Sequence, residues 1–159
     1  MKVEIYSRAA IEKRLQEGPL KNTAVISFYD PPPSRTPADY SPLNYDGKCD
    51  LVFPVGVHDI DIEVLPEYDL AFETYFSEAK NLASFIKNAC ADNMDIICQC
   101  EYGQSRSAAC AAAIREYYYS DGISIFADYR YYPNQLIFNK LLEALHETDD
   151  KEVNHEQEG

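Results

Sequence analysis

The chain has 159 residues, of which 46% are hydrophobic and 13% aromatic, and these values fit one globular domain with one core. A formal net charge of −13 argues against nucleic acid and anionic membranes as partners, because both bind through clustered Lys and Arg. No apolar run approaches the roughly 20 residues that cross a bilayer. The first residues alternate as a strand does and do not resemble a signal peptide. We therefore expect a cytoplasmic protein.

The cysteines support that expectation. There are five, an odd number, and none shows the paired spacing of a metal site. They are Cys49, Cys90, Cys98, Cys100 and Cys110. A reducing compartment suits such a set, and the sequence predicts neither a metal ion nor another cofactor.

Apolar spacing predicts three strands and one helix in the first third of the chain. In chain order these are a strand at 3–7, a helix at 9–16, a strand at 23–29 and a strand at 51–57. Proline-rich sequence fills most of 30–48, where neither sheet nor helix can continue. We expect a surface loop there, either a rigid connector or, by slight preference, a wall of an active-site mouth.

The rest of the chain alternates in the same way. We expect a long amphipathic helix at 70–89, a short buried strand from 94 to 100, a helix at 107–119 and a last helix at 134–147. Strands alternating with helices predict an α/β fold, a single layered domain whose central, mostly parallel sheet is flanked by helices. This domain is assigned to 1–146. The polar, aperiodic segment 147–159 is predicted to be an acidic, mobile tail.

The most informative segment joins the buried strand to the alanine-rich helix that follows it. Cys100 and Arg106 stand at the two edges of the intervening loop. Five residues between them allow the backbone to curl with successive N–H groups pointing inward, and the helix adds the positive end of its dipole. Such a loop binds an anion at its centre. The candidate phosphate-binding residues are Glu101, Tyr102, Gly103, Gln104, Ser105 and Arg106.

Each residue type in this segment suits phosphoryl chemistry. The field of the loop favours the thiolate of Cys100 over the thiol, which makes it a nucleophile. Arg106 offers a planar fork that binds two phosphoryl oxygens at once. Gly103 fits a position where a side chain would obstruct the curl. Ser107 is placed to donate a hydrogen bond to the sulfur and help it depart in a second step.

With these residues the chain resembles the cysteine-based protein tyrosine phosphatases, in particular their compact dual-specificity branch and its bacterial relatives. The signature of that superfamily is His-Cys-x5-Arg-Ser/Thr, and Cys100, Gly103, Arg106 and Ser107 match it. The resemblance extends over about 1–145, through features at 26–31, 57–61, 75–76 and 133–134. One departure is Gln99, which stands where the family usually has histidine. A neutral amide there is expected to alter the stability of the thiolate.

The same resemblance implies a general acid, an aspartate that follows the strand before the long helix. Asp59 is the first candidate and Asp61 the second. Asp69 is a weaker third candidate, since an aspartate at this position is typical of the N-cap of the long helix. His58 is expected to have a loop role rather than a catalytic one.

These features predict a phosphomonoesterase that uses a cysteinyl-phosphate intermediate and needs no metal. The expected substrate is a phosphorylated protein or a small phosphomonoester, with phosphotyrosine preferred and phosphoserine and phosphothreonine as further options. The loop contains no lysine, which disfavours inositol phosphates and RNA ends. A second hypothesis is a catalytically weak or inactive phosphate-binding module. It is motivated by Gln99 in place of the usual histidine and by the choice between Asp59 and Asp61 as the acid. A sulfur-transfer or arsenate-reducing domain ranks lower, because Cys100 lies late in the chain. The oligomeric state is not predicted.

Overall fold

Four strands form one parallel sheet in the order β1-β4-β2-β3, as the computed structural model of the chain shows. The structure describes residues 1–32 and 42–158, with side chains as far as residue 148. The strands are β1 (Val3–Ser7), β2 (Thr23–Tyr29), β3 (Leu51–Gly56) and β4 (Asp95–Cys100). The predicted α/β class with a central parallel sheet is confirmed. The position of β4 between β1 and β2 places its carboxyl end near the middle of the sheet edge.

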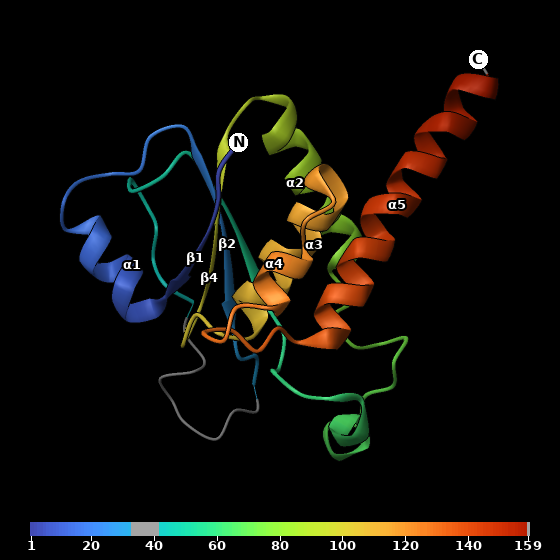
Figure 1. Cartoon of the computed structure of the whole chain (residues 1–159), viewed down its shortest axis with the longest axis horizontal. Helices are drawn as coiled ribbons and strands as arrows, with labels where there is room; N and C mark the ends of the chain where they lie inside the picture. Colours follow the sequence, from blue (N-terminus) through green and yellow to red (C-terminus); the bar gives the residue numbers. More distant parts are fainter. Residues whose placement is uncertain (33–41, 159) are drawn as a thin grey trace.

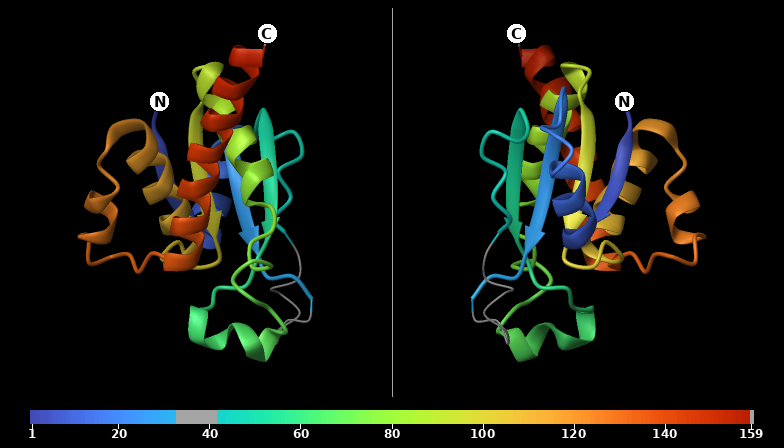
Figure 2. Two further views of the ribbon diagram at one scale, coloured as in Figure 1. Left: turned by 90° about the vertical axis from the view of Figure 1, so that its right-hand side faces the viewer. Right: turned by 90° about the vertical axis from the view of Figure 1, so that its left-hand side faces the viewer.

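Helices cover both faces of this sheet (Figure 1). On one side lies α1 (Arg8–Leu15), and on the other lie α2 (Ala79–Ala91), α3 (Arg106–Tyr119), α4 (Ile123–Phe126) and α5 (Gln135–Glu158). The larger core lies between the sheet and α2, α3 and α5. A smaller cluster of Ile11, Leu20, Val25, Tyr45 and Ile97 fills the α1 side. The carboxyl ends of the strands point toward one end of the molecule, where the longer loops gather (Figure 2).

Strand β4 contributes side chains to both faces because successive residues of a strand point to opposite sides. Ile96, Cys98 and Cys100 belong to the larger core, whereas Ile97 belongs to the smaller one. The helix α3 that follows is buried from Arg106 to Ile114. Its run of alanines at 108–113, interrupted only by Cys110, permits close packing against its neighbours on all sides. Cys100 and Arg106 thus belong to two of the most buried elements of the fold, β4 and α3.

The predicted long helix at 70–89 is wrong in its first half. Residues 62–68 form a short 3-10 helix, η2 (Ile62–Tyr68), and α2 begins only at Ala79. The intervening residues turn, with Phe76 in the left-handed region at φ 54°. Tyr75 and Phe76 are buried there, and Lys140 donates to the carbonyl oxygens of Phe72 and Tyr75. Tertiary contacts therefore override the helical spacing of this segment.

Asp69 is corrected for the same reason. It was predicted as the N-cap of the long helix, but it is the residue that ends η2, with a left-handed φ of 55°. Short helices of this kind commonly end on a residue in that conformation.

The last helix is also longer than predicted. It was expected to end at Glu147, and α5 continues to Glu158, since no proline or glycine interrupts residues 135–158. The predicted tail at 147–159 is therefore helical as far as Glu158. Its mobility stays a prediction. Of the proline-rich loop, residues 33–41 lie outside the described part of the chain.

Candidate active site

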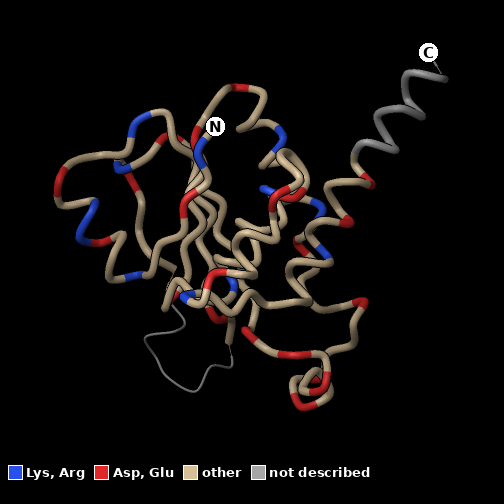
Figure 3. The backbone as a smooth tube through the Cα atoms, viewed as in Figure 1, with Lys and Arg blue, Asp and Glu red and all other residues tan. Residues whose placement is uncertain are grey.

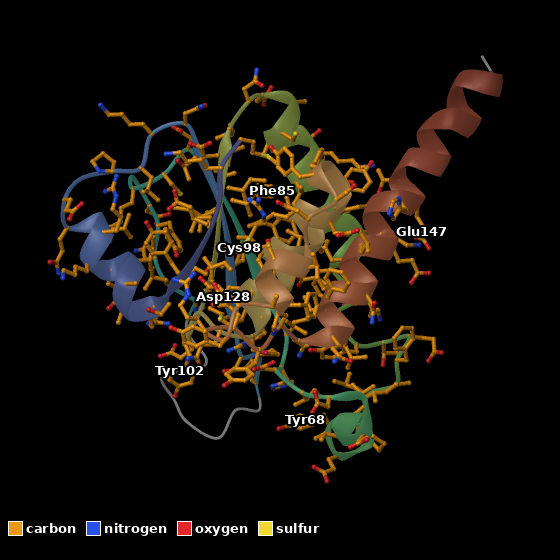
Figure 4. All side chains as sticks on the ribbon, viewed as in Figure 1. Tyr68, Phe85, Cys98, Tyr102, Asp128 and Glu147 are labelled. Atoms are coloured by element: carbon orange, nitrogen blue, oxygen red, sulfur yellow. The ribbon has the colours of Figure 1, made fainter. Side chains whose placement is uncertain are left out.

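The loop between β4 and α3 has the predicted residues at its two edges. Cys100 is the last residue of β4 and Arg106 the first residue of α3. Their exposed fractions are only 3% and 5%. The loop lies at the carboxyl end of the sheet, the usual position for a ligand site in parallel α/β folds. Figure 4 shows Cys98 in the interior and Tyr102 at the edge of the molecule, so the chain passes outward through this site.

The carbonyl groups of the loop are held away from its centre by hydrogen bonds from neighbouring backbone. The N–H groups of Arg8, Tyr132 and Asn134 donate to the carbonyl oxygens of Glu101, Gln104 and Ser105 at 3.0, 2.8 and 3.2 Å. In a trans peptide unit the C=O and the following N–H point in opposite directions. The N–H groups of Tyr102, Ser105 and Arg106 therefore point away from the segments that bind these carbonyl groups. Together with the N-terminus of α3 they form a concavity that suits an anion.

Gly103 occupies a position that only glycine fits. Its φ is +67°, and an added Cβ would lie 2.6 Å from the backbone N of Ser7. The loop therefore packs directly on the junction between β1 and α1. This close contact holds the backbone of the loop in place against the end of β1.

Arg106 is held by two contacts at one side of its fork. Its Nη1 donates to Oδ1 of Asp30 at 2.8 Å and to the carbonyl oxygen of Val57 at 3.0 Å. Its Nε–H is buried and has no partner among the described residues. A buried charged donor without a partner costs several kcal/mol unless it meets an acceptor. The guanidinium is thus oriented by Asp30 and offers an unused donor, as an oxyanion site requires.

Ser107 contacts the candidate nucleophile as the sequence predicted. The Cys100 Sγ and Ser107 Oγ atoms are 3.0 Å apart. When the sulfur is a thiolate, the hydroxyl group is the donor of this bond. All five cysteines are free thiols. Burial, together with neighbouring Cys98, raises the pKa of Cys110, so that thiol stays protonated near neutral pH and does not compete as a nucleophile.

Gln99 points to the opposite face of β4 from Cys100. Its exposed fraction is 1%, and its Oε1 accepts hydrogen bonds from Ser27 Oγ at 2.6 Å and Tyr45 OH at 2.8 Å. Burial raises the pKa of Tyr45, which keeps the phenol protonated as a donor. The amide therefore fixes the end of β4 to β2 and to the loop that follows it. Sequence reasoning singled out Gln99 but gave no role to Tyr45.

Asp59 and Asp61 differ clearly in their surroundings. Oδ1 of Asp59 accepts from Ser105 Oγ at 2.7 Å and from Asn134 Nδ2 at 2.9 Å. These bonds bring its carboxyl group to the rim of the loop, and a proton carried by it would sit on Oδ2. Asp61 is exposed and is the N-cap residue of η2, without a side-chain capping bond. Of the two, Asp59 is the residue that the structure joins to the loop.

Asn134 is a site residue whose part in the site the sequence did not reveal. It is 5% exposed, and its Nδ2 also donates to the carbonyl oxygen of Ile60 at 3.2 Å. Its Oδ1 accepts from the backbone N of Ile137 at 2.9 Å, which caps α5. Asn134 therefore connects Asp59 to the start of α5. An asparagine just before a helix indicates a cap, but nothing local indicates its second partner.

The described residues include no group of three or more His, Cys, Asp and Glu side chains that could hold a metal ion. Within residues 1–32 and 42–158, no helix is both long and apolar enough to cross a membrane.

No protein-family model and no curated protein sequence matches the chain. Several solved structures do. PTPMT1 in complex with PI(5)P is 13% identical, with a TM-score of 0.53, over 94% of each chain. A mouse putative dual specificity phosphatase complexed with zinc tungstate is 18% identical, with a TM-score of 0.52, over 95% of this chain and 86% of that one. PTP-2 phosphatase of Cydia pomonella is 14% identical, with a TM-score of 0.50, over 90% of this chain and 85% of that one.

These comparisons confirm the predicted resemblance at the level of the fold. The chain has the fold of the dual-specificity and protein tyrosine phosphatases. A tie to the bacterial relatives of that branch stays a prediction.

The close packing of Gly103 against Ser7 leads to a prediction about anion binding. We expect Gly103→Ala to weaken the binding of tungstate at least about tenfold, or about 1.4 kcal/mol, because the new Cβ pushes the loop off Ser7 and turns its N–H groups. Isothermal titration calorimetry measures this. Gly47→Ala is the matched control, since Gly47 has a φ of +70° with nothing within 4 Å of an added Cβ. It shares the backbone strain but should leave the affinity unchanged. Equal affinities in all three proteins would contradict the proposed packing.

Proposed function

We propose that this chain, which has the fold of the dual-specificity phosphatases, is a metal-independent phosphomonoesterase that acts through a cysteinyl-phosphate intermediate. The observation that carries the proposal is the unpartnered, buried Nε–H of Arg106. We assign it to the same anion site as the N–H groups of Tyr102, Ser105 and Arg106, in the loop that begins at the buried Cys100. A tetrahedral dianion supplies acceptors for all of these donors at once.

In the first step the Cys100 thiolate attacks the phosphorus atom in line with the ester oxygen. The S–P bond forms and the P–O ester bond breaks, with its electron pair leaving on the oxygen. Asp59 gives that oxygen a proton from Oδ2. Arg106 and the loop N–H groups stabilise the charge on the three equatorial oxygens, while Asp30 keeps the guanidinium in position.

In the second step water attacks the cysteinyl phosphate. Asp59, now a carboxylate, accepts a proton from the water as the new P–O bond forms. The S–P bond breaks and its electron pair returns to sulfur. The Ser107 hydroxyl group, 3.0 Å from Sγ, donates a hydrogen bond to the departing thiolate. Inorganic phosphate then leaves and the starting thiolate is restored.

The proposed substrate is phosphotyrosine, with phosphoserine and phosphothreonine as lesser substrates. The side chains of the loop include Glu101 and no lysine, so the site has few cations beyond Arg106 for a second phosphate group. Such a balance favours a monoester with one phosphoryl group. Free thiols throughout the chain support a reducing, cytoplasmic setting.

The nucleophile is tested with p-nitrophenyl phosphate in the presence of EDTA. We expect turnover by the unmodified chain without added metal, and a loss of at least about 10³-fold in Cys100→Ser, because the hydroxyl group is a much weaker nucleophile than a thiolate. Cys90→Ser, at a half-buried cysteine outside the loop, is the control and should stay active. Metal-dependent turnover would contradict the mechanism. Tungstate binding without turnover would favour the phosphate-binding module.

The general acid is tested by leaving-group dependence. Asp59→Asn should slow phenyl phosphate by about 10²–10⁴, because its leaving group needs a proton. It should slow p-nitrophenyl phosphate much less. Asp61→Asn, with the same change of charge two residues away, should behave almost normally with both esters. If Asp61→Asn alone shows the leaving-group effect, the assignment of the acid is reversed.

A further inference from the structure

We propose that a cleft beside the catalytic loop binds the residues that flank the phosphorylated residue of a protein substrate, and that it selects lysine and arginine there. This inference rests on the proposed phosphatase activity and names the class of substrate. The cleft has a volume of about 780 Å³, within the range of clefts that hold ligands larger than one side chain. One wall follows the ends of β2 and β3, and the other is formed by 67–70 and 74–77. Both walls lie at the end of the molecule that carries the loops (Figure 2).

Arg106 connects this cleft to the catalytic loop. The two acceptors of its Nη1, the Asp30 carboxylate and the Val57 carbonyl group, belong to residues that line the cleft. The arginine itself is more than nine-tenths buried and keeps an unpartnered Nε–H. Arg106 therefore lies against residues of one wall of the cleft, and we place the phosphoryl group that it binds beside that wall. The rest of the substrate chain passes along its walls.

Among the described residues that line the cleft, the charged side chains Asp30, Glu67 and Asp69 are all acidic. Residues 58–78 contain seven carboxylates and neither Lys nor Arg, and Figure 3 shows this segment marked with red and without blue. The seven are Asp59, Asp61, Glu63, Glu67, Asp69, Glu73 and Glu78. Glu67 and Asp69 line the cleft and are exposed. Among the described lining residues there is no Lys or Arg to neutralise them. Such a wall repels a second phosphate group and attracts a cation.

Aromatic rings add a surface for the stem of such a cation. The rings of His58 and Tyr68 lie against each other with centroids 4.8 Å apart, and both residues line the cleft. Burial, and to a lesser degree Arg106, lowers the pKa of His58 against the opposing effect of Asp30. The imidazole is therefore neutral at pH 7 and does not repel a cation. Lys and Arg side chains combine an apolar stem with a charged end, which suits rings beside carboxylates. Figure 4 shows Tyr68 at the same end of the molecule as Tyr102.

The test uses three sets of phosphotyrosine peptides that differ only at the flanking positions, which carry Lys, Gln or Glu. With the unmodified chain we expect kcat/KM to fall in the order Lys, Gln, Glu, by about three- to tenfold from Lys to Glu, as two exposed ion pairs permit. The ratio should shrink toward one in high salt. The kcat/KM for p-nitrophenyl phosphate, which has no flanking residues, serves as the reference.

The decisive variant is Glu67→Gln combined with Asp69→Asn. Both changes keep side-chain size, and Asn tolerates the left-handed conformation of residue 69. This variant should lose most of the preference for Lys over Glu and keep its activity toward p-nitrophenyl phosphate. The matched control is Glu63→Gln with Glu73→Gln, which removes two charges from the same segment away from the cleft lining. The control should keep most of the preference.

The outcomes separate this inference from the proposed activity. If the unmodified chain hydrolyses p-nitrophenyl phosphate but treats Lys and Glu peptides alike, the cleft assignment is wrong and the activity stands. Equal loss of preference in both double variants would also overturn it, because overall charge would then explain the selection. Absence of turnover with every substrate would refute the proposed function itself.

Discussion

Three backbone hydrogen bonds, which engage carbonyl groups of the loop between β4 and α3, are the constraint on which the candidate site depends. They come from Arg8 at the start of α1 and from Tyr132 and Asn134 just before α5, so elements from both ends of the chain hold the loop open. The peptide geometry then directs the N–H groups that follow these carbonyl groups the opposite way. Gly103 lets the loop rest directly on Ser7, and no added side chain could occupy that contact. The shape of the loop is thus a property of the assembled fold.

The same assembly brings four carboxylates close to the loop or to the cleft beside it. Asp30 at the end of β2 orients Arg106, Ser105 and Asn134 hold Asp59, and the Glu67 and Asp69 pair faces the adjoining cleft. The carboxylates have different positions and are assigned different roles. Asp30 pairs with the guanidinium group, Asp59 is proposed as the proton donor at the loop, and Glu67 and Asp69 are proposed to form a wall for a cationic substrate. In this proposal a chain with a net charge of −13 binds a dianion through the local field of backbone N–H groups and one arginine at the loop.

Local sequence was sufficient for the parts of the site that are built within one segment. Cys100, Gly103, Arg106 and Ser107 are all found in the predicted positions, since a strand, a tight loop and a helix follow one another without an insertion. Distant contacts were not predictable in this way. Asp30, Tyr45 and Asn134 reach the site only because β2, the loop after it and the start of α5 meet at the carboxyl end of the sheet. Residues 70–78 have helical spacing, yet they form turns in which Tyr75 and Phe76 are buried in the core. The sequence of this segment alone does not indicate that burial of these two side chains outweighs helix formation.

The central claim is that Cys100 carries the phosphoryl group during turnover. The most direct measurement is acid quenching of the enzyme during hydrolysis of p-nitrophenyl phosphate in EDTA, followed by mass spectrometry of its peptides. We predict one phosphoryl group on the peptide that contains Cys100, bound through sulfur and absent from Cys100→Ser. Full turnover without phosphorylation of Cys100, or with the phosphoryl group on another residue, would contradict the account.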